Sequence, residues 1–322
     1  MNKQILTTLD SIATEADRGQ FKKPDFNGIL TGFSGEKLMH CLQGFTRALC
    51  DKDTVYVEIG VFQGLTLLSN AAANPGIDCF GIDNFSLFNE GKGNFALVQE
   101  RMRKLAVTNA TIINADYEEA LHYLSSHIGG RKVGVFFVDG PHDYRSQLLP
   151  LLLAKPYLAD NCVIVVDDSN YAHVRQANGD FLRSEPDFAL LFEAYTRAHV
   201  ANLAPAEKAE VAAGWWNGVN VMVRDPSRLV PRAFPPEHAK HLYVESHETF
   251  RHEFAELAFP ALKAAQTMLD GTPEQADQAL SGLKAALLEA RRVHPGRFKN
   301  QNTYSEVLPG FKLHASSAAG RE

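Results

Sequence analysis

The chain has 322 residues, of which 45% are hydrophobic and 22% are charged, and its formal net charge is −6. This composition is that of a globular protein with a sizeable core, and it excludes a collagen-like, coiled-coil or wholly disordered chain. No run approaches the roughly 18 apolar residues of a membrane-spanning helix, and the start of the chain does not resemble a signal peptide. We therefore expect a cytoplasmic protein with no membrane partner.

The charge pattern and the cysteines exclude two further classes. Acidic residues outnumber basic ones and no basic block is present, so we expect no nucleic-acid partner. The four cysteines form no CxxC pair, which argues against a zinc site or a disulfide framework. His238 and His241 lie three residues apart, but no further metal ligand accompanies them.

Residues 1–50 read as a helical lead-in, because apolar residues recur there at helical spacing. From about residue 54 to 168, short β-branched runs then alternate with helical patterns. This alternation predicts a parallel sheet covered by helices on both faces. The predicted strands are 55–61, 78–83, 110–116, 132–140 and 161–168, and the predicted helices are 65–73, 94–106, 117–126 and 143–158.

Beyond Asp168 we expect a polar loop and then a helix over 188–197. Two further strands, over 199–203 and 218–225, would complete a seven-stranded sheet. From residue 238 to 293 the pattern is helical again, and the end of the chain reads as a frayed tail. The predicted organisation is a helical lead-in (1–50), an α/β ligand-binding domain (51–225) and a helical extension (226–322). The apolar stripes of the extension need burial, which favours a lid or a contact in a homo-oligomer.

Parallel sheets bind ligands at the carboxyl ends of their strands. The first strand ends in VEIGVFQGLT, where Glu58, Gly60 and Gly64 lead into a helix. Glycine permits tight turns and close ligand approach there. Asp83 ends the second strand 19 residues after Gly64, a spacing typical of an acid that binds ribose hydroxyls, and Asp116 ends the third strand. Either aspartate could instead cap the next helix, but together they favour an adenosine-containing ligand.

The fourth and fifth strands end in Asp139 and in the pair Asp167 and Asp168. Adjacent strands would bring these three carboxylates close together, where they repel one another unless a cation neutralises them. A hard divalent ion such as Mg²⁺ would resolve the conflict, whereas solvated loop acids would not need one. His142 lies on the loop beside the same cleft and could accept a proton from a substrate hydroxyl.

As an ordered set, VEIGVFQGLT, GIDNF, NAD, FFVDGPHDY and VIVVDD resemble the class I S-adenosylmethionine-dependent methyltransferases. The branch that they resemble includes macrocin and other sugar O-methyltransferases and relatives from cephalosporin biosynthesis. The resemblance covers about residues 50–225. It implies a Rossmann-like α/β fold with a seven-stranded, mostly parallel sheet, S-adenosylmethionine as cofactor, and O-methylation of a small molecule such as a sugar or secondary metabolite.

The resemblance also implies roles for individual residues. Glu58, Gly60 and Gly64 would border the methionine part of the cofactor, and Asp83 would hold the ribose. Asp116 and Tyr117 would flank the adenine. Asp139, Asp167 and Asp168 would hold Mg²⁺. The sequence departs from many relatives at Pro141, where they carry a second acid, so that His142 and Asp143 are both candidates for the catalytic base beside Asp139.

Two other functions remain open at this point. An NAD-dependent oxidoreductase would also use Asp83 for ribose, but GVFQGLT is a poor dinucleotide fingerprint and the paired acids after the fifth strand have no role in it. A non-catalytic, methyltransferase-like interaction module would leave the acids without a function. The identity of the methyl acceptor is not encoded in these motifs.

Overall fold

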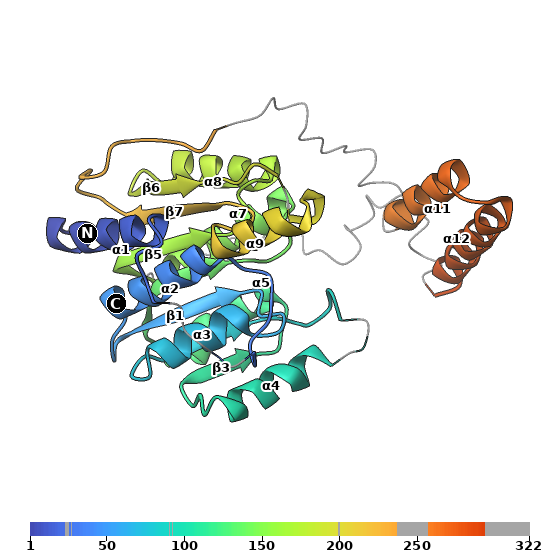
Figure 1. Ribbon diagram of the computed structural model, residues 1–322. Helices are drawn as coiled ribbons and strands as arrows, with labels where there is room; N and C mark the ends of the chain where they lie inside the picture. Colours follow the sequence, from blue (N-terminus) through green and yellow to red (C-terminus); the bar gives the residue numbers. More distant parts are fainter. Residues whose placement is uncertain are drawn as a thin grey trace, which may run out of the picture. The chain divides into compact units, whose positions relative to one another are not determined.

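The computed structural model describes residues 1–22, 26, 28–89, 91, 93–198, 200–236 and 257–293. The chain divides into two compact units, Met1–Leu242 and Tyr243–Glu322. The first unit contains the sheet and every candidate site residue, and the second contains a pair of helices (Figure 1). The domain limits at residues 50 and 225 stay a prediction.

The first unit is built on one seven-stranded sheet with the order β3-β2-β1-β4-β5-β7-β6. β1 lies between β2 and β4 and is parallel to both, whereas β7 is antiparallel to its neighbours β5 and β6. The predicted α/β fold with a mostly parallel sheet is therefore confirmed. The strands are β1 (Thr54–Ile59), β2 (Cys79–Ile82), β3 (Ala110–Ile113), β4 (Lys132–Val138), β5 (Leu158–Val166), β6 (Phe188–Ala194) and β7 (Val219–Arg224).

Helices cover both faces of the sheet, because successive strand residues send apolar side chains to opposite sides. Tyr56 of β1 packs into the core layer that contains α1, α2 and α3, while Val55 and Val57 pack into the layer with α5, α7 and α8. The helices of this unit are α1 (Lys3–Asp17), α2 (Glu36–Leu49), α3 (Leu65–Ala73), α4 (Asn94–Lys104), α5 (Tyr117–His122), α6 (Leu124–His127), α7 (Tyr144–Ala154), α8 (Ala172–Ser184) and α9 (Pro205–Ala213), with 3₁₀ turns η1 (Lys155–Tyr157) and η2 (Val200–Asn202).

The segment after Asp168 differs from the sequence prediction. The expected polar loop contains α8, which buries Val174, Ala177 and Phe181 at helical spacing. Asn178 and Gly179 weaken the helix signal in this segment. In the fold, however, Asn178 Nδ2 donates a 2.9 Å hydrogen bond to Asn220 Oδ1, which gives the buried amide nitrogen a partner on β7.

The predicted helix over 188–197 is also wrong, because Phe188–Ala194 is β6. This edge strand pairs with β7 and buries Phe188 and Leu190 on one face. Its leucine, alanine and glutamate residues favour helix locally, and pairing with β7 overrides that preference. The predicted strand over 199–203 is wrong as well: η2 lies there, and β6 supplies the seventh strand instead.

The four cysteines are free and buried in the sheet and its helical layers. Burial raises the pKa of Cys162 to about 12. Free buried cysteines of this kind, Cys79 and Cys162 among them, pack as small apolar side chains.

In the second unit, α11 (Ala258–Asp270) and α12 (Pro273–Val293) form a helical pair. Several large apolar side chains are exposed on it, including Phe259 and Leu269. The rest of the predicted helical extension, over 238–256, and the predicted tail lie outside the described residues.

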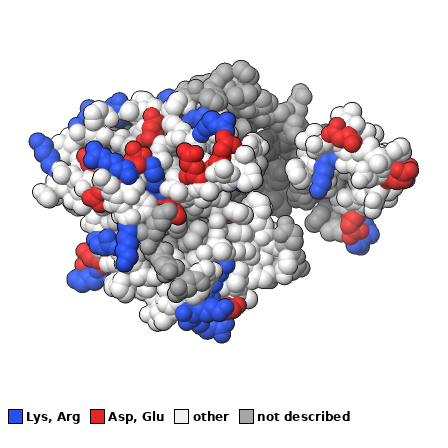
Figure 2. Space-filling model, in the orientation of Figure 1, with Lys and Arg blue, Asp and Glu red and all other residues white. Residues whose placement is uncertain are grey.

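In the described part of the chain, no helix is long and apolar enough to span a membrane. On the face drawn in Figure 2, basic and acidic side chains are interspersed. The absence of a nucleic-acid partner stays a prediction.

The central strand β4 should dominate the stability of the first unit. Phe136 of β4 is fully buried, so Phe136→Ala should lower the free energy of unfolding by about 3–5 kcal/mol in urea titrations. Leu152→Ala on α7, where the leucine is 38% exposed, is the control and should cost less than about 1 kcal/mol. Equal losses in the two variants would contradict the assigned core.

Candidate functional site

The predicted glycine turn follows β1 and leads into α3. Gly60 has φ of 92°, and a Cβ built on it would lie 1.8 Å from the carbonyl oxygen of Asp139 at the end of β4. Gly64 has φ of 83° and is the N-cap of α3. Only glycine adopts such backbone angles freely. Both residues thus hold the end of β1 close to β4 and aim the start of α3 at the carboxyl edge of the sheet.

Glu58 is fully buried in β1. Its carboxyl group accepts hydrogen bonds from Tyr56 Oη at 2.6 Å and from Thr66 Oγ1 at 3.1 Å. Burial raises the pKa of Glu58 to about 8; the two hydrogen bonds oppose this rise, and the negative charge of Asp83 adds to it. Glu58 is therefore protonated in a neutral solution and ties β1 to the first turn of α3.

Asp83, directly after β2, organises the loops around it. Its Oδ2 accepts the backbone N–H groups of Val61 at 2.9 Å and Phe62 at 2.7 Å, and its Oδ1 accepts that of Phe85 at 2.6 Å. Phe62 and Phe85 have φ of 48° and 53°, in the left-handed region that non-glycine residues rarely occupy. Asp83, which we predicted to bind the ribose, thus also shapes the turn that follows β1.

Asp116 and Tyr117 lie at the start of α5, on the far side of β2 from β1. Asp116 is exposed and caps the helix by accepting the Glu118 N–H at 2.9 Å. Tyr117 is half-buried, and burial raises the pKa of its hydroxyl group. The helix-capping alternative considered for Asp116 is therefore realised, while its exposed carboxylate remains accessible from the carboxyl edge of the sheet.

The predicted carboxylate cluster forms at the ends of β4 and β5. Oxygen atoms of Asp139 and Asp168 and one ring nitrogen of His142 all lie within 4.8 Å of one another. Asp167 is not part of this group: its Oδ1 accepts the N–H of Asp168 at 2.8 Å. The sequence therefore placed the acids at one edge correctly, and the structure brings His142 in where Asp167 was expected.

The pKa values of the buried acids reflect their crowding. Burial, followed by the charge of Asp168, raises the pKa of Asp139 well above its usual range. Burial, followed by the charges of Asp139 and Asp168, does the same for Asp167. Carboxylates placed this close together share protons or bind a cation.

His142 occupies the loop between β4 and α7. Its Nε2 lies 2.8 Å from Asp168 Oδ2, and its ring stacks on Tyr171 at a centroid distance of 5.3 Å. Burial lowers the pKa of His142, but the hydrogen bond to Asp168 and the charges of Asp168, Asp167 and Asp143 outweigh it, so that the net shift is upward. Asp143 is exposed and caps α7 by accepting the Ser146 N–H at 3.0 Å.

Three residues to which the sequence analysis gave no role complete the site. Asn217, fully buried before β7, donates from Nδ2 to Asp168 Oδ1 at 2.5 Å and so fixes the carboxylate whose own backbone has φ of 54°. Tyr171 supports His142, and Thr66 supports Glu58. The spacing of Thr66 after Glu58 was visible in the sequence, whereas Asn217 lies 49 residues from Asp168 and carries no local signal.

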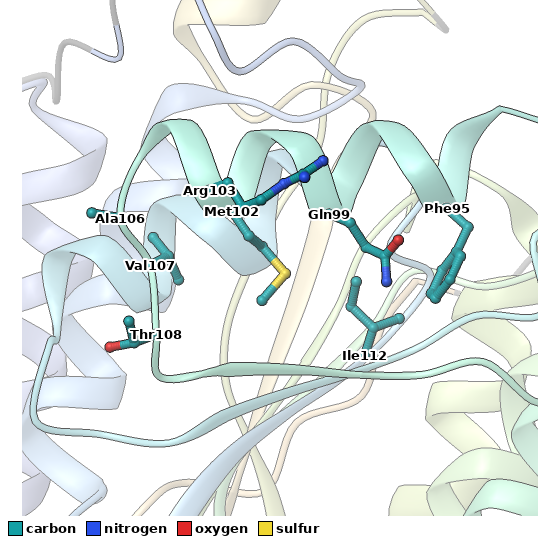
Figure 3. A pocket seen from close by; sticks show the side chains of 8 residues that line it. All are labelled: Phe95, Gln99, Met102, Arg103, Ala106, Val107, Thr108 and Ile112. Atoms are coloured by element: carbon teal, nitrogen blue, oxygen red, sulfur yellow. The ribbon is translucent and has the colours of Figure 1, made fainter.

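A separate hollow of about 700 Å³ lies between α4 and β3 (Figure 3). Phe95, Met102, Val107 and Ile112 supply apolar walls, and Gln99 and Arg103 also line it. It contains none of the acids or glycines that the sequence singled out. The hollow is therefore distinct from the carboxyl edge of the sheet.

Comparison with known proteins identifies the class. Residues 57–169, about a third of the chain, match the family model described as a methyltransferase domain. This segment runs from β1 to the residue after Asp168 and contains the whole acid cluster. This segment thus matches a methyltransferase domain, and the resemblance inferred from the motifs is confirmed at that level.

Solved structures with a similar fold have low identity to this chain. Cofactor-bound Rv0187 from MTB is 13% identical, with 69% of this chain and 90% of that chain covered and a TM-score of 0.45. The O-methyltransferase TomG from Streptomyces achromogenes, in complex with SAM, is 15% identical, with 70% and 91% covered and a TM-score of 0.45. The O-methyltransferase from Bacillus cereus, in complex with SAH, is 12% identical, with 68% and 91% covered and a TM-score of 0.43. A search of curated proteins finds no match. At these values none of the three structures assigns a substrate to this chain.

The buried proton on Glu58 should make stability depend on pH. The folded-state pKa, about 8, lies above the usual 4.5, so the folded protein retains a proton that the unfolded chain releases. The stability that this proton provides is present below pH 4.5 and is lost as the pH rises towards 8, by up to about 1.4 kcal/mol per pH unit. Glu58→Gln should reduce this slope in urea unfolding, and Glu119→Gln on the exposed surface of α5 should not. A slope that Glu58→Gln leaves unchanged would contradict the buried protonated carboxyl.

Proposed function

We propose that this chain is an S-adenosylmethionine-dependent O-methyltransferase that acts on a hydroxyl group of a small molecule with the help of a divalent cation. The observation that carries the proposal is the convergence of Asp139, His142 and Asp168 beside the Gly60 turn, within the segment that matches a methyltransferase domain. A cofactor held at the turn and a hydroxyl group held at the acids would lie at neighbouring strand ends. Such neighbours are what an in-line group transfer requires.

The residues after β1 and β2 fit the cofactor. Gly60 and Gly64 leave room for close approach, and the start of α3 offers backbone N–H groups. Asp83 Oδ1 accepts one backbone N–H group and keeps a lone pair for a ribose hydroxyl, whereas Oδ2 already accepts two. Asp116 and Tyr117 would flank the adenine. When bound, the cofactor supplies an electrophilic methyl group on a sulfonium.

The acids fit a divalent cation. Asp139 and Asp168 present carboxylate oxygens, and crowding opposes ionisation of Asp139 unless positive charge is present. Oxygen ligands suit Mg²⁺, and a histidine nitrogen within the group would also suit a transition metal. Asp167, the residue before Asp168, would support the cation from that neighbouring position. The cation would lower the pKa of an acceptor hydroxyl group and fix its direction.

His142 is the better candidate for the base. Its Nε2 faces Asp168, while its Nδ1 is buried and finds no hydrogen-bond partner among the described residues. A hydrogen bond from Nε2–H to Asp168 leaves the lone pair on Nδ1, which could accept the proton of the acceptor hydroxyl. Asp143 uses its carboxylate to cap α7, so a direct catalytic role suits it less.

We also propose that the protein is cytoplasmic and forms a homo-oligomer. The second unit supports an oligomer, because the described part of α11 and α12 leaves Phe259, Leu262 and Leu269 largely exposed. Apolar faces of this kind need a partner or a lid. We further propose that its methyl acceptor is a small molecule and that it has no nucleic-acid or membrane partner.

Asp83 should determine cofactor affinity. Asp83→Asn removes the carboxylate charge and one of the two acceptor oxygens, and it should weaken binding of S-adenosylhomocysteine by about 10-fold to 100-fold in calorimetry. Asp78→Asn, which alters the exposed partner of Arg131, is the matched control. Unchanged affinity in Asp83→Asn would remove Asp83 from the cofactor site.

The metal should depend on Asp139 and Asp168. Asp139→Asn and Asp168→Asn should each weaken Mn²⁺ or Mg²⁺ binding by at least about tenfold in calorimetry, whereas Asp143→Asn should not. Chelation should abolish methyl transfer and leave S-adenosylhomocysteine binding intact. His142→Ala should lower the rate; a parallel loss of metal affinity would make His142 a ligand rather than the base. Full activity in excess chelator would overturn the metal-assisted mechanism.

A further inference from the structure

Four aromatic side chains from separate loops gather at the mouth of the carboxyl edge, and we call them the aromatic wall: Phe33, Phe62, Phe88 and Trp216. Phe33 stacks on Phe62 at a centroid distance of 5.1 Å and on Trp216 at 6.1 Å, and Phe88 meets the ring of Phe62 edge-on at 6.3 Å. Phe33 and Phe88 are 57% and 69% exposed. Phenylalanine rings normally bury their surface, so an exposed stacked group marks a place where a ligand or partner binds.

The wall lies next to both halves of the proposed site. Phe62 is in the turn between Gly60 and Gly64, and its N–H donates to Asp83 at 2.7 Å. Trp216 precedes Asn217, which holds the Asp168 carboxylate. The wall is therefore joined at one end to the turn between Gly60 and Gly64, which we call the cofactor turn after its proposed role, and at the other end to the acid cluster.

The backbone holds the wall in place at a cost in strain. Phe62, Phe88 and Trp216 have φ of 48°, 49° and 56°. Left-handed angles in large side chains are unfavourable by about 1–3 kcal/mol each and persist where the surroundings impose them, most often at functional sites.

Several contacts impose this arrangement. Arg101 donates to the carbonyl groups of Thr31 at 3.1 Å and Gln63 at 2.7 Å, which fixes the loops of Phe33 and Phe62 relative to each other. A Cβ on Gly35 would lie 2.2 Å from the carbonyl oxygen of Gly214, so the Phe33 and Trp216 segments are in close backbone contact. The wall is thus preorganised before any ligand binds, which lowers the entropy cost of binding.

We propose that the aromatic wall binds the methyl acceptor, and that the acceptor's hydroxyl group is carried on a flat aromatic ring. The inference rests on the proposed function and names its substrate class. In the proposed complex an aromatic ring would stack on Phe33 or Trp216 with its hydroxyl groups towards the acids, to which Trp216 is linked through the neighbouring Asn217. A saturated polyol can place only C–H groups against these rings and lacks the π face of an aromatic acceptor, and hydroxyl groups turned towards Phe33 or Phe88 would lose solvation.

Binding of catechol to the full chain, with S-adenosylhomocysteine and Mg²⁺ present, tests this inference by calorimetry. Phe33→Ala should weaken catechol binding by about tenfold. Phe33→Tyr, which keeps the ring, should bind catechol as the wild type does. Phe88→Ala should act in the same direction. Tyr123→Ala is the matched control, because Tyr123 is 56% exposed on the same unit but lies outside the wall. The saturated counterpart, cis-cyclohexane-1,2-diol, should bind more weakly than catechol, and Phe33→Ala should change its affinity less.

Fluorescence supplies a second measurement on the same samples. The two tryptophans of the chain are Trp215 and Trp216, so a Trp215→Phe variant reports on the wall alone. Catechol should quench this variant and leave Trp216→Phe nearly unaffected. Intact S-adenosylhomocysteine binding together with catechol affinity that is the same in Phe33→Ala and wild type would overturn the aromatic acceptor and leave the methyltransferase proposal standing. Absence of S-adenosylhomocysteine binding in the wild type would overturn both.

Discussion

The crowding of acidic side chains at the carboxyl ends of β1, β4 and β5 is the constraint on which the rest of the site depends. Glu58, Asp139 and Asp167 are raised in pKa by burial and by their neighbours, and Asp168 lies among them. Parallel pairing of β1 with β4 and of β4 with β5 makes this proximity unavoidable. Two arrangements reduce the repulsion between these acids. Glu58 holds a proton and accepts two hydrogen bonds, and Asp168 has His142 and Asn217 as partners.

The same edge explains why the loops are so tightly specified. Gly60 must be glycine because the carbonyl group of Asp139 occupies the space of a Cβ, and Asp83 holds the following residues in place through their N–H groups. Phe62 therefore adopts a left-handed backbone conformation, and its ring belongs to the aromatic wall. The members of the wall come from segments far apart in the sequence. Acid cluster, cofactor turn and aromatic wall are therefore parts of one connected framework.

Much of this framework could be predicted from the sequence, and the reasons for success and failure are physical. The five central strands and their helices follow from buried β-branched runs, and the placement of Asp83, Asp139 and Asp168 follows from strand polarity alone. The α8 and β6 segments could not be assigned, because pairing with β7 and the buried Asn178–Asn220 contact override local propensity. The role of Asn217 and the aromatic wall depend on tertiary contacts between distant segments, and such contacts produce no recognisable spacing of residues in the sequence.

The account's central claim is that the crowded acids hold a cation beside the cofactor turn. A crystal structure of the protein grown with Mn²⁺ and S-adenosylhomocysteine, with anomalous data at the manganese edge, tests it most directly. We expect an anomalous peak within about 2.0–2.6 Å of carboxylate oxygens of Asp139 and Asp168, with the cofactor on the glycine turn. A structure with bound S-adenosylhomocysteine but no peak at these acids would contradict it.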